Sequence, residues 1–280
     1  MAAVTELGYV GLNVTDIEAW KDFASSVAGL EVMDEGEKDR FYLRMDYWHH
    51  RLVVHRSDED DMAYMGWRVP DAEALNEIKD QLQAAGYQSR IASPEEAAER
   101  RVLGLLKLVD SHLPFHPGRR MHGKWVTGAQ GMGHVLVRAY DQAETYNFYS
   151  ALGLKGNVQY HLNTPNGVVK PTFMYCNRRQ HSLAFGVGDE KRLNHMMLEY
   201  EHLNDLGKAH DIVRERGIDV ALQLGKHAND AALTFYFATP SGWLLELGWA
   251  GEPSFQQQQY HIKDVFGHGI EASGMHDVEL

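Results

Sequence analysis

Two histidines and one glutamate in the second half of the chain have the side chains needed to hold a metal ion. His134 lies in "GMGHVLV", His195 in "RLNHMMLEY" and Glu246 in "WLLELGW". Each stretch reads as a β-strand, and a carboxylate among apolar residues is costly to bury unless a positive charge meets it. Two imidazoles and one carboxylate form the facial triad typical of non-haem Fe(II), which leaves positions open for substrate and O₂. Fe(II) is therefore expected, and the same ligand types also accept Mn(II).

Three further polar residues of the second half are placed for proton transfer or hydrogen bonding. They are His181 in "NRRQHSLAF", His227 in "GKHANDAAL" and Tyr236 in "TFYFATP". A neutral imidazole beside a metal site can exchange a proton, because its pKa is close to neutral pH. Simpler interpretations stay open: His181 as a turn histidine beside two arginines, with a counterpart in His50, and Tyr236 as an ordinary core tyrosine.

The elements that must position these residues occur twice in the chain. Residues 7–30 and 132–154 each read as a strand, an aspartate at a helix N-cap, an amphipathic helix and a Gly-Leu stop. The N-cap residues are Asp16 and Asp141. Because strands of repeated units lie side by side, residues far apart in sequence are expected to converge on one centre.

The later segments repeat as well. Residues 41–56 resemble 172–187, and both read as two short strands joined by a polar turn. Residues 64–87 resemble 194–218, and both read as a strand followed by a helix that stops at a glycine. The offset of roughly 125 residues is too long for a solenoid repeat and indicates two similar domains.

The predicted class is α+β, with two duplicated domains that each contain paired βαβββ units. The domains are expected at 1–122 and 123–280, with a Gly-rich, basic linker near 116–128. The position that matches His134 in the first half is Tyr9, and the strand "MGWRV" carries no histidine. Only the C-terminal domain is therefore expected to bind metal.

Charge and composition exclude several classes of partner. The formal net charge of −12 argues against nucleic acid and against anionic membrane surfaces. No stretch of about 18 apolar residues is present, so no transmembrane helix is expected. The N-terminus does not read as a signal peptide. Cys176 is the only cysteine, which fits a reducing compartment, and a cytoplasmic location is expected.

The stretch "GKHANDAALTFYFATPSGWLLE" (225–246) resembles the signature of the type I extradiol catechol dioxygenases of the vicinal oxygen chelate superfamily. The stretches "GMGHVLV", "CNRRQHSLAF" and "KRLNHMMLEY" support the resemblance, which extends over nearly the whole chain. Within the family, the chain looks most like the 1,2-dihydroxynaphthalene dioxygenases, with the 2,3-dihydroxybiphenyl 1,2-dioxygenases close by. The resemblance implies Fe(II)-dependent cleavage of a bicyclic catechol by O₂ in aromatic hydrocarbon degradation, by a homo-oligomer, an octamer among relatives.

The resemblance also implies a role for each site residue. His134, His195 and Glu246 would bind the metal, and His181 would be the acid–base residue beside the O₂ site. His227 and Tyr236 would hydrogen-bond the catecholate or its products. The remaining substrate-site residues it implies are Phe173 and Gly186 on the wall against the distal ring, and Asn229 and Asp230 around the ligands.

The chain departs from the family pattern near the end of its first half. The first domain of relatives closes with a strand of the form Pro-x-Gly-Asn-x-x-Glu, whereas here the chain runs from Asp110 straight into the linker. About fifteen expected residues are absent, which would leave a sheet edge exposed. The stretch 185–195 is also a few residues short.

Two other functions remain open on the sequence. A glyoxalase-like isomerase or lyase of the same fold would use four protein ligands across paired modules, and Tyr9 stands where a fourth ligand would be needed. A non-catalytic module that binds flat aromatic ligands would not need an intact set of three ligands.

Overall fold

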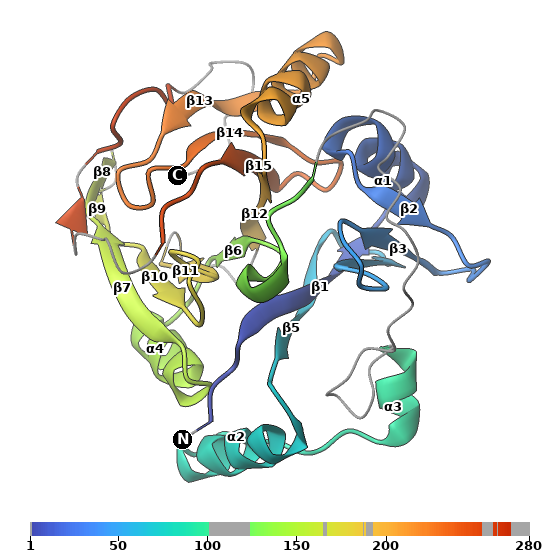
Figure 1. Ribbon diagram of the computed structural model, residues 1–280, viewed down its shortest axis with the longest axis vertical. Helices are drawn as coiled ribbons and strands as arrows, with labels where there is room; N and C mark the ends of the chain where they lie inside the picture. Colours follow the sequence, from blue (N-terminus) through green and yellow to red (C-terminus); the bar gives the residue numbers. More distant parts are fainter. Residues whose placement is uncertain are drawn as a thin grey trace.

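The computed structural model describes residues 2–100, 124–164, 167–186, 188, 193–253, 260–261 and 263–269 (Figure 1). The first half folds as one strand–helix unit followed by the start of a second. Its described elements are β1 (Glu6–Val14), α1 (Ile17–Phe23), the π-helix η1 (Ala24–Ala28), β2 (Glu31–Met33), β3 (Arg40–Arg44), β4 (Leu52–Arg56), β5 (Asp61–Arg68), α2 (Ala72–Ala84) and α3 (Pro94–Glu99).

The second half repeats this order of elements and contains the whole of the second unit. Its described elements are the 3₁₀-helix η2 (Gly128–Gln130), β6 (His134–Val137), α4 (Gln142–Ala151), β7 (Lys155–Tyr160), β8 (Leu162–Thr164), β9 (Gly167–Val169), β10 (Thr172–Tyr175), β11 (Leu183–Phe185), β12 (Leu193–Tyr200), α5 (Leu203–Glu215), β13 (Val220–Lys226), β14 (Leu233–Ala238), β15 (Leu244–Trp249) and β16 (Tyr260–His261).

The sheet of the second half is built from two βαβββ units, whose strands follow the same order outward from the β12–β6 pair. Its strand order is β13-β14-β15-β12-β6-β11-β10-β7-β16, and β8 and β9 form a separate two-stranded sheet. In each unit the last strand lies parallel to the first, as β11 does to β6 and β15 to β12. The units join through antiparallel pairing of β12 with β6. The predicted paired βαβββ architecture is thus confirmed.

The sheet of the first half has the order β2-β3-β4-β1-β5. Strand β4 is parallel to β1, and β5 is antiparallel to β1, as in the first unit and the first strand of the second unit. The strand expected to be missing would fall within 101–123, and the short stretch at 185–195 includes 187 and 189–192. Both lie outside the described residues, as does the predicted domain boundary between 122 and 123, so these points stay predictions.

The helices of the repeated segments 7–30 and 132–154 begin and end where the sequence predicts. The side chain of Asp16 accepts a hydrogen bond from the Ala19 amide at 2.9 Å, and Asp141 does the same for Glu144. Gly29 and Gly153 follow their helices with φ of 76° and 89°, the left-handed conformation that favours glycine. None of the helices in the described part of the chain is long and apolar enough to cross a membrane.

The two halves share one hydrophobic core. Trp20 of α1 packs on Trp243 with ring centroids 5.3 Å apart, and its indole N–H donates to Ser241 at 2.8 Å. Helix α5 lies beside α1 (Figure 1), where Arg216 forms an ion pair with Asp22 at 2.7 Å. These contacts pack the first half against the half that carries the candidate metal ligands.

One glycine fixes how closely β6 can approach β12. Gly133, just before His134, has φ of 143°, and a Cβ built on it would lie 1.9 Å from the carbonyl oxygen of Met197. Only a residue without a side chain fits this approach. By contrast, Gly207 lies in helix α5, and beyond the helix's own backbone no atom of the described residues is within 4 Å of the position a Cβ would take.

These two glycines give a matched prediction for stability. Gly133→Ala should lower the free energy of unfolding by about 2–4 kcal/mol, because the methyl group clashes with backbone and the φ is strained. Gly207→Ala should raise it by about 0.5–1 kcal/mol, because alanine is the better helix former. Denaturant titration of both variants measures the two changes. Equal effects would contradict the assigned role of Gly133.

Candidate metal and catalytic site

Three neighbouring strands at the centre of the large sheet bring His134, His195 and Glu246 together. His134 begins β6, His195 lies on β12 and Glu246 lies on β15. Met197 of β12 pairs with both His134 and Glu246, so the register of the sheet sets the three side chains side by side. The arrangement of the repeated units therefore produces the convergence that the sequence predicts.

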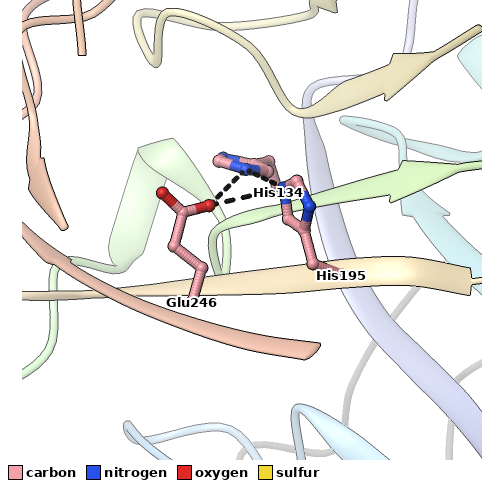
Figure 2. A group of neighbouring side chains, drawn as sticks. All are labelled: His134, His195 and Glu246. Carbon is pink, nitrogen blue, oxygen red and sulfur yellow. Dashed lines mark hydrogen bonds and ion pairs between the residues drawn. The ribbon is translucent and has the colours of Figure 1, made fainter. Parts of the chain in front are cut away.

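The three side chains point at one another (Figure 2). The Nε2 atoms of His134 and His195 lie 3.2 and 3.4 Å from Oε2 of Glu246, and 3.3 Å from each other. Ligand atoms that share one ion at bonds of about 2.0–2.2 Å stand about 3 Å apart. The triangle is therefore close to the size that a single divalent cation requires.

The carboxylate of Glu246 carries the clearest sign that a cation belongs here. Glu246 is 1% exposed, and its Oε2 makes no hydrogen bond with any described residue. A buried acceptor without a partner costs about 1–3 kcal/mol, and more when it is charged. Burial opposes ionisation, yet the imidazoles of His134 and His227 hold the pKa of the Glu246 carboxyl well below its usual range. An ionised, unsatisfied oxygen between two histidines fits a metal ion.

The histidine on β12 has the protonation state that a ligand requires. Burial lowers the pKa of His195 to about 3, so its imidazole is neutral at pH 7. Its Nδ1 contacts Oδ1 of Asn194 at 2.9 Å, which leaves Nε2 toward Glu246. Metal binding needs neutral imidazole and ionised carboxylate, and the site supplies both.

His181 lies next to the triad, in the turn before β11. Its ring centroid is 3.8 Å from that of His134, and the ring of Phe173 meets it edge to face at 4.8 Å. Nδ1 of His181 is in close contact with the side-chain oxygen of Gln180. Burial, and then the neighbouring His134, lower the pKa of His181 well below its usual value. His181 is thus a neutral imidazole whose Nδ1 is occupied.

His227 follows β13 and links the triad to Tyr236. Its Nε2 lies 2.8 Å from the Tyr236 hydroxyl, 3.1 Å from Oε1 of Glu246 and 3.2 Å from the Thr234 hydroxyl. Its Nδ1 lies 3.1 Å from Oδ1 of Asp264. Burial would lower the pKa of His227, but the carboxylates of Asp264 and Glu246 raise it well above its usual value. Burial, and then Glu246, raise the pKa of Tyr236, so its hydroxyl stays protonated.

A cavity of about 150 Å³ opens beside the triad. The polar side chains on its wall include those of His134, His181, His195, His227 and Tyr236. The apolar side chains on its wall are those of Leu136, Leu162, Pro171, Phe173, Leu222 and Leu244. A pocket with one polar end and one apolar wall suits a flat ligand with polar groups at one edge.

Not all of the predicted substrate-site residues face this cavity. Phe173 and Asn229 line it, but Gly186 and Asp230 do not. A Cβ on Gly186 would meet the side chain of Gln142, so this glycine allows α4 to pack on the sheet. The Asp230 side chain accepts from the Ala232 amide at 3.0 Å and shapes the turn between β13 and β14.

Several polar residues at the site were not predicted from the sequence. Tyr160 of β7 and Asp264 line the cavity, and the His268 ring packs at a tilt against the His227 ring, with centroids 4.4 Å apart. Asp264 and His268 belong to the C-terminal segment, 263–269 in the described part of the chain. The only signal is an aspartate and a histidine four residues apart in a polar tail.

Known proteins share both the sequence and the fold. The Glyoxalase/Bleomycin resistance protein/Dioxygenase superfamily matches residues 131–247, and the family Dihydroxybiphenyl dioxygenase BphC D1 matches 7–56. A biphenyl-2,3-diol 1,2-dioxygenase of Sphingomonas paucimobilis is 58% identical over 98% of this chain and 97% of its own. A 1,2-dihydroxynaphthalene dioxygenase of Sphingobium xenophagum is 56% identical over 98% of each chain.

This chain belongs to the type I extradiol catechol dioxygenases. A crystal structure of a catechol 2,3-dioxygenase agrees with the fold at a TM-score of 0.94 and 52% identity, over 98% of this chain and 97% of that one. The family predicted from 225–246 is confirmed, and with it an enzyme that cleaves aromatic catechols outside the two hydroxyls. Neither the isomerase nor the non-catalytic alternative is supported by these relatives.

The triad generates a prediction about metal retention. Glu246→Gln keeps the size of the side chain but removes its charge, and it should reduce bound metal from about one ion per chain to less than a tenth. Elemental analysis of the purified variant measures this. Glu144→Gln, on the exposed side of helix α4, is the control and should keep its metal. Stoichiometric metal in Glu246→Gln would show that the triad is not the site.

Proposed function

We propose that this enzyme uses O₂ and Fe(II) to cleave a bicyclic catechol, with 1,2-dihydroxynaphthalene as its main substrate. The observation that carries the proposal is that His134 and His195 line the same cavity as an apolar wall that includes Phe173. Relatives 54–56% identical are named 1,2-dihydroxynaphthalene dioxygenases. The 58% identical relative named for biphenyl-2,3-diol supports 2,3-dihydroxybiphenyl as the second candidate.

His134, His195 and Glu246 would hold the metal. When bound, Fe(II) supplies positive charge that lowers the pKa of the catechol hydroxyls and provides places for the diol and O₂. Mn(II) accepts the same donors and is the alternative. The unsatisfied Oε2 of Glu246 supports a divalent ion in either case.

His181 would move the proton. It is neutral because burial lowers its pKa, so it can accept a proton from the bound catechol and return it as the ring opens. The close contact of Nδ1 with Gln180 leaves Nε2 as the atom that exchanges the proton. Gln180 would hold the ring in the orientation that this exchange needs.

His227 and Tyr236 would orient the diol at the other side of the triad. Their side chains contact each other at 2.8 Å, and both line the cavity. The protonated Tyr236 hydroxyl can donate to a catechol oxygen or to the oxygen of the developing product. Phe173 and the neighbouring leucines would bury the second ring and exclude water from the reacting carbons.

The assembly and location of the enzyme are also proposals. We propose a cytoplasmic homo-oligomer, and an octamer as the first count to test, on the basis of the family resemblance and the single cysteine. Light scattering on the purified protein would give the count.

Oxygen uptake tests the proposed reaction. Fe(II)-loaded enzyme in air should consume one O₂ per diol, and kcat/KM should fall in the order 1,2-dihydroxynaphthalene, 2,3-dihydroxybiphenyl, catechol. Catechol comes last because it has no second ring to bury against the apolar wall. The naphthalene diol comes first because relatives 54–56% identical are named for it. An oxygen electrode and the absorbance of the product measure both quantities. Tight diol binding without oxygen uptake would contradict the proposed function, and a preference for catechol would contradict the assignment of the apolar wall.

Replacement of His181 tests the proton transfer. His181→Ala should keep the metal and lower kcat by a factor of about 10²–10⁴, the usual loss for a positioned acid–base group. His202→Gln, at an exposed helix end, is the control and should leave kcat unchanged. Unaltered turnover in His181→Ala would remove His181 from the mechanism.

A further inference from the structure

The C-terminal segment lies along β13, a strand of the sheet that carries the metal ligands. The Val265 amide donates to the Lys226 carbonyl, and the Lys226 amide donates to the Phe266 carbonyl, both at 2.8 Å. Glycines make this approach possible. A Cβ on Gly225 would lie 2.4 Å from the backbone nitrogen of His268, and one on Gly267, where φ is 78°, would lie 2.3 Å from the Leu224 carbonyl oxygen. The segment therefore packs closely against β13, beside the site.

This placement inserts one carboxylate between two imidazoles. Oδ1 of Asp264 lies 3.1 Å from Nδ1 of His227, and its Oδ2 lies 2.8 Å from Nδ1 of His268. The Tyr160 hydroxyl donates to Oδ1 at 3.0 Å. His268 is held in turn by the Thr234 hydroxyl, 3.0 Å from its Nε2. Each carboxylate oxygen of Asp264 therefore has its own imidazole partner.

The contact with Asp264 decides how the His227 ring is held. An ionised carboxylate only accepts hydrogen bonds, so Nδ1 of His227 must carry a proton. The ring is then fixed with Nε2 toward Tyr236 and Glu246. A carboxylate behind an imidazole sets tautomer and orientation in this way in many enzyme sites.

We infer that Asp264, held by His268, is a positioning residue that fixes His227 for its contact with the diol. The inference rests on the proposed function, in which His227 touches the substrate. It assigns the C-terminal segment a part in turnover. Without the carboxylate, the His227 ring is free to turn, and the hydrogen bonds at Nε2 lose their direction.

The same three residues could instead be taken as a second metal site, because their ligand atoms lie within 4.8 Å of one another. The geometry favours positioning. Both Nδ1 atoms meet separate oxygens of Asp264 at hydrogen-bond distances, so the three side chains satisfy one another without an ion. Metal counting separates the two possibilities.

The test uses full-length, metal-loaded enzyme with 1,2-dihydroxynaphthalene. Asp264→Ala should lower kcat about 10–100-fold while KM stays within about threefold and the metal stays at one ion per chain. Asp264→Asn retains an oxygen that accepts from Nδ1 and should recover part of this loss. Val265→Ala, an exposed neighbour in the same segment, is the control and should behave like the parent enzyme.

A double-mutant cycle distinguishes positioning from general damage. In a His227→Gln background, Asp264→Ala should change kcat by less than about twofold, because its effect passes through His227. A crystal structure of Asp264→Ala should show the His227 ring turned away from Tyr236, and this readout needs no turnover.

Three results would overturn the inference: unchanged kcat in Asp264→Ala, a full additional loss in the His227→Gln background, or a second ion that Asp264→Ala loses. If the parent enzyme consumes no O₂ with any diol, the proposed function fails. The ring orientation in the crystal then still decides whether Asp264 positions His227.

Discussion

A single buried carboxylate oxygen needs a positive charge beside it, and the rest of the site is arranged around that need. Oε2 of Glu246 is ionised, enclosed and without a hydrogen-bond partner among the described residues. The other oxygen, Oε1, has His227 as its partner, so the missing positive charge belongs on the side of His134 and His195. Removing a charge from water is tolerated only where an opposite charge meets it. The sheet register, the glycine at 133 and the neutral His195 all serve to place a cation at that point.

Among the described residues, the first half has aromatic side chains where the second half has its metal ligands. In the first half Tyr9 occupies the position of His134, and its ring packs against His50 and Tyr64 at centroid distances of 5.3 and 6.1 Å. Gly66 leaves room for it, since a Cβ there would lie 2.1 Å from the ring. Aromatic packing thus fills the place that the second half keeps for a metal. The first half contributes instead through the shared core, as the Trp20–Trp243 contact shows.

The sequence predicts those features that depend on local pattern or on repetition. Asp16 and Asp141 cap their helices because the capping interaction spans only three residues. His134, His195 and Glu246 converge because repeated strands pair in a known order. Gly186 was expected on the wall against the distal ring, yet it packs against Gln142, because such packing cannot be read from a single strand. Asp230 was expected around the metal ligands, and its side chain accepts from the Ala232 amide in the turn between β13 and β14. Asp264 could not be placed, since its segment has no apolar period and is seated by backbone contacts near Gly225 and Gly267.

Anomalous diffraction at the iron absorption edge, from crystals loaded with Fe(II) without air, shows whether His134, His195 and Glu246 hold the metal. An ion held by the triad gives one peak per chain, at about 2.0–2.3 Å from Nε2 of His134, Nε2 of His195 and Oε2 of Glu246. A peak elsewhere, such as among His227, Asp264 and His268, or no peak in fully loaded crystals, would contradict this assignment.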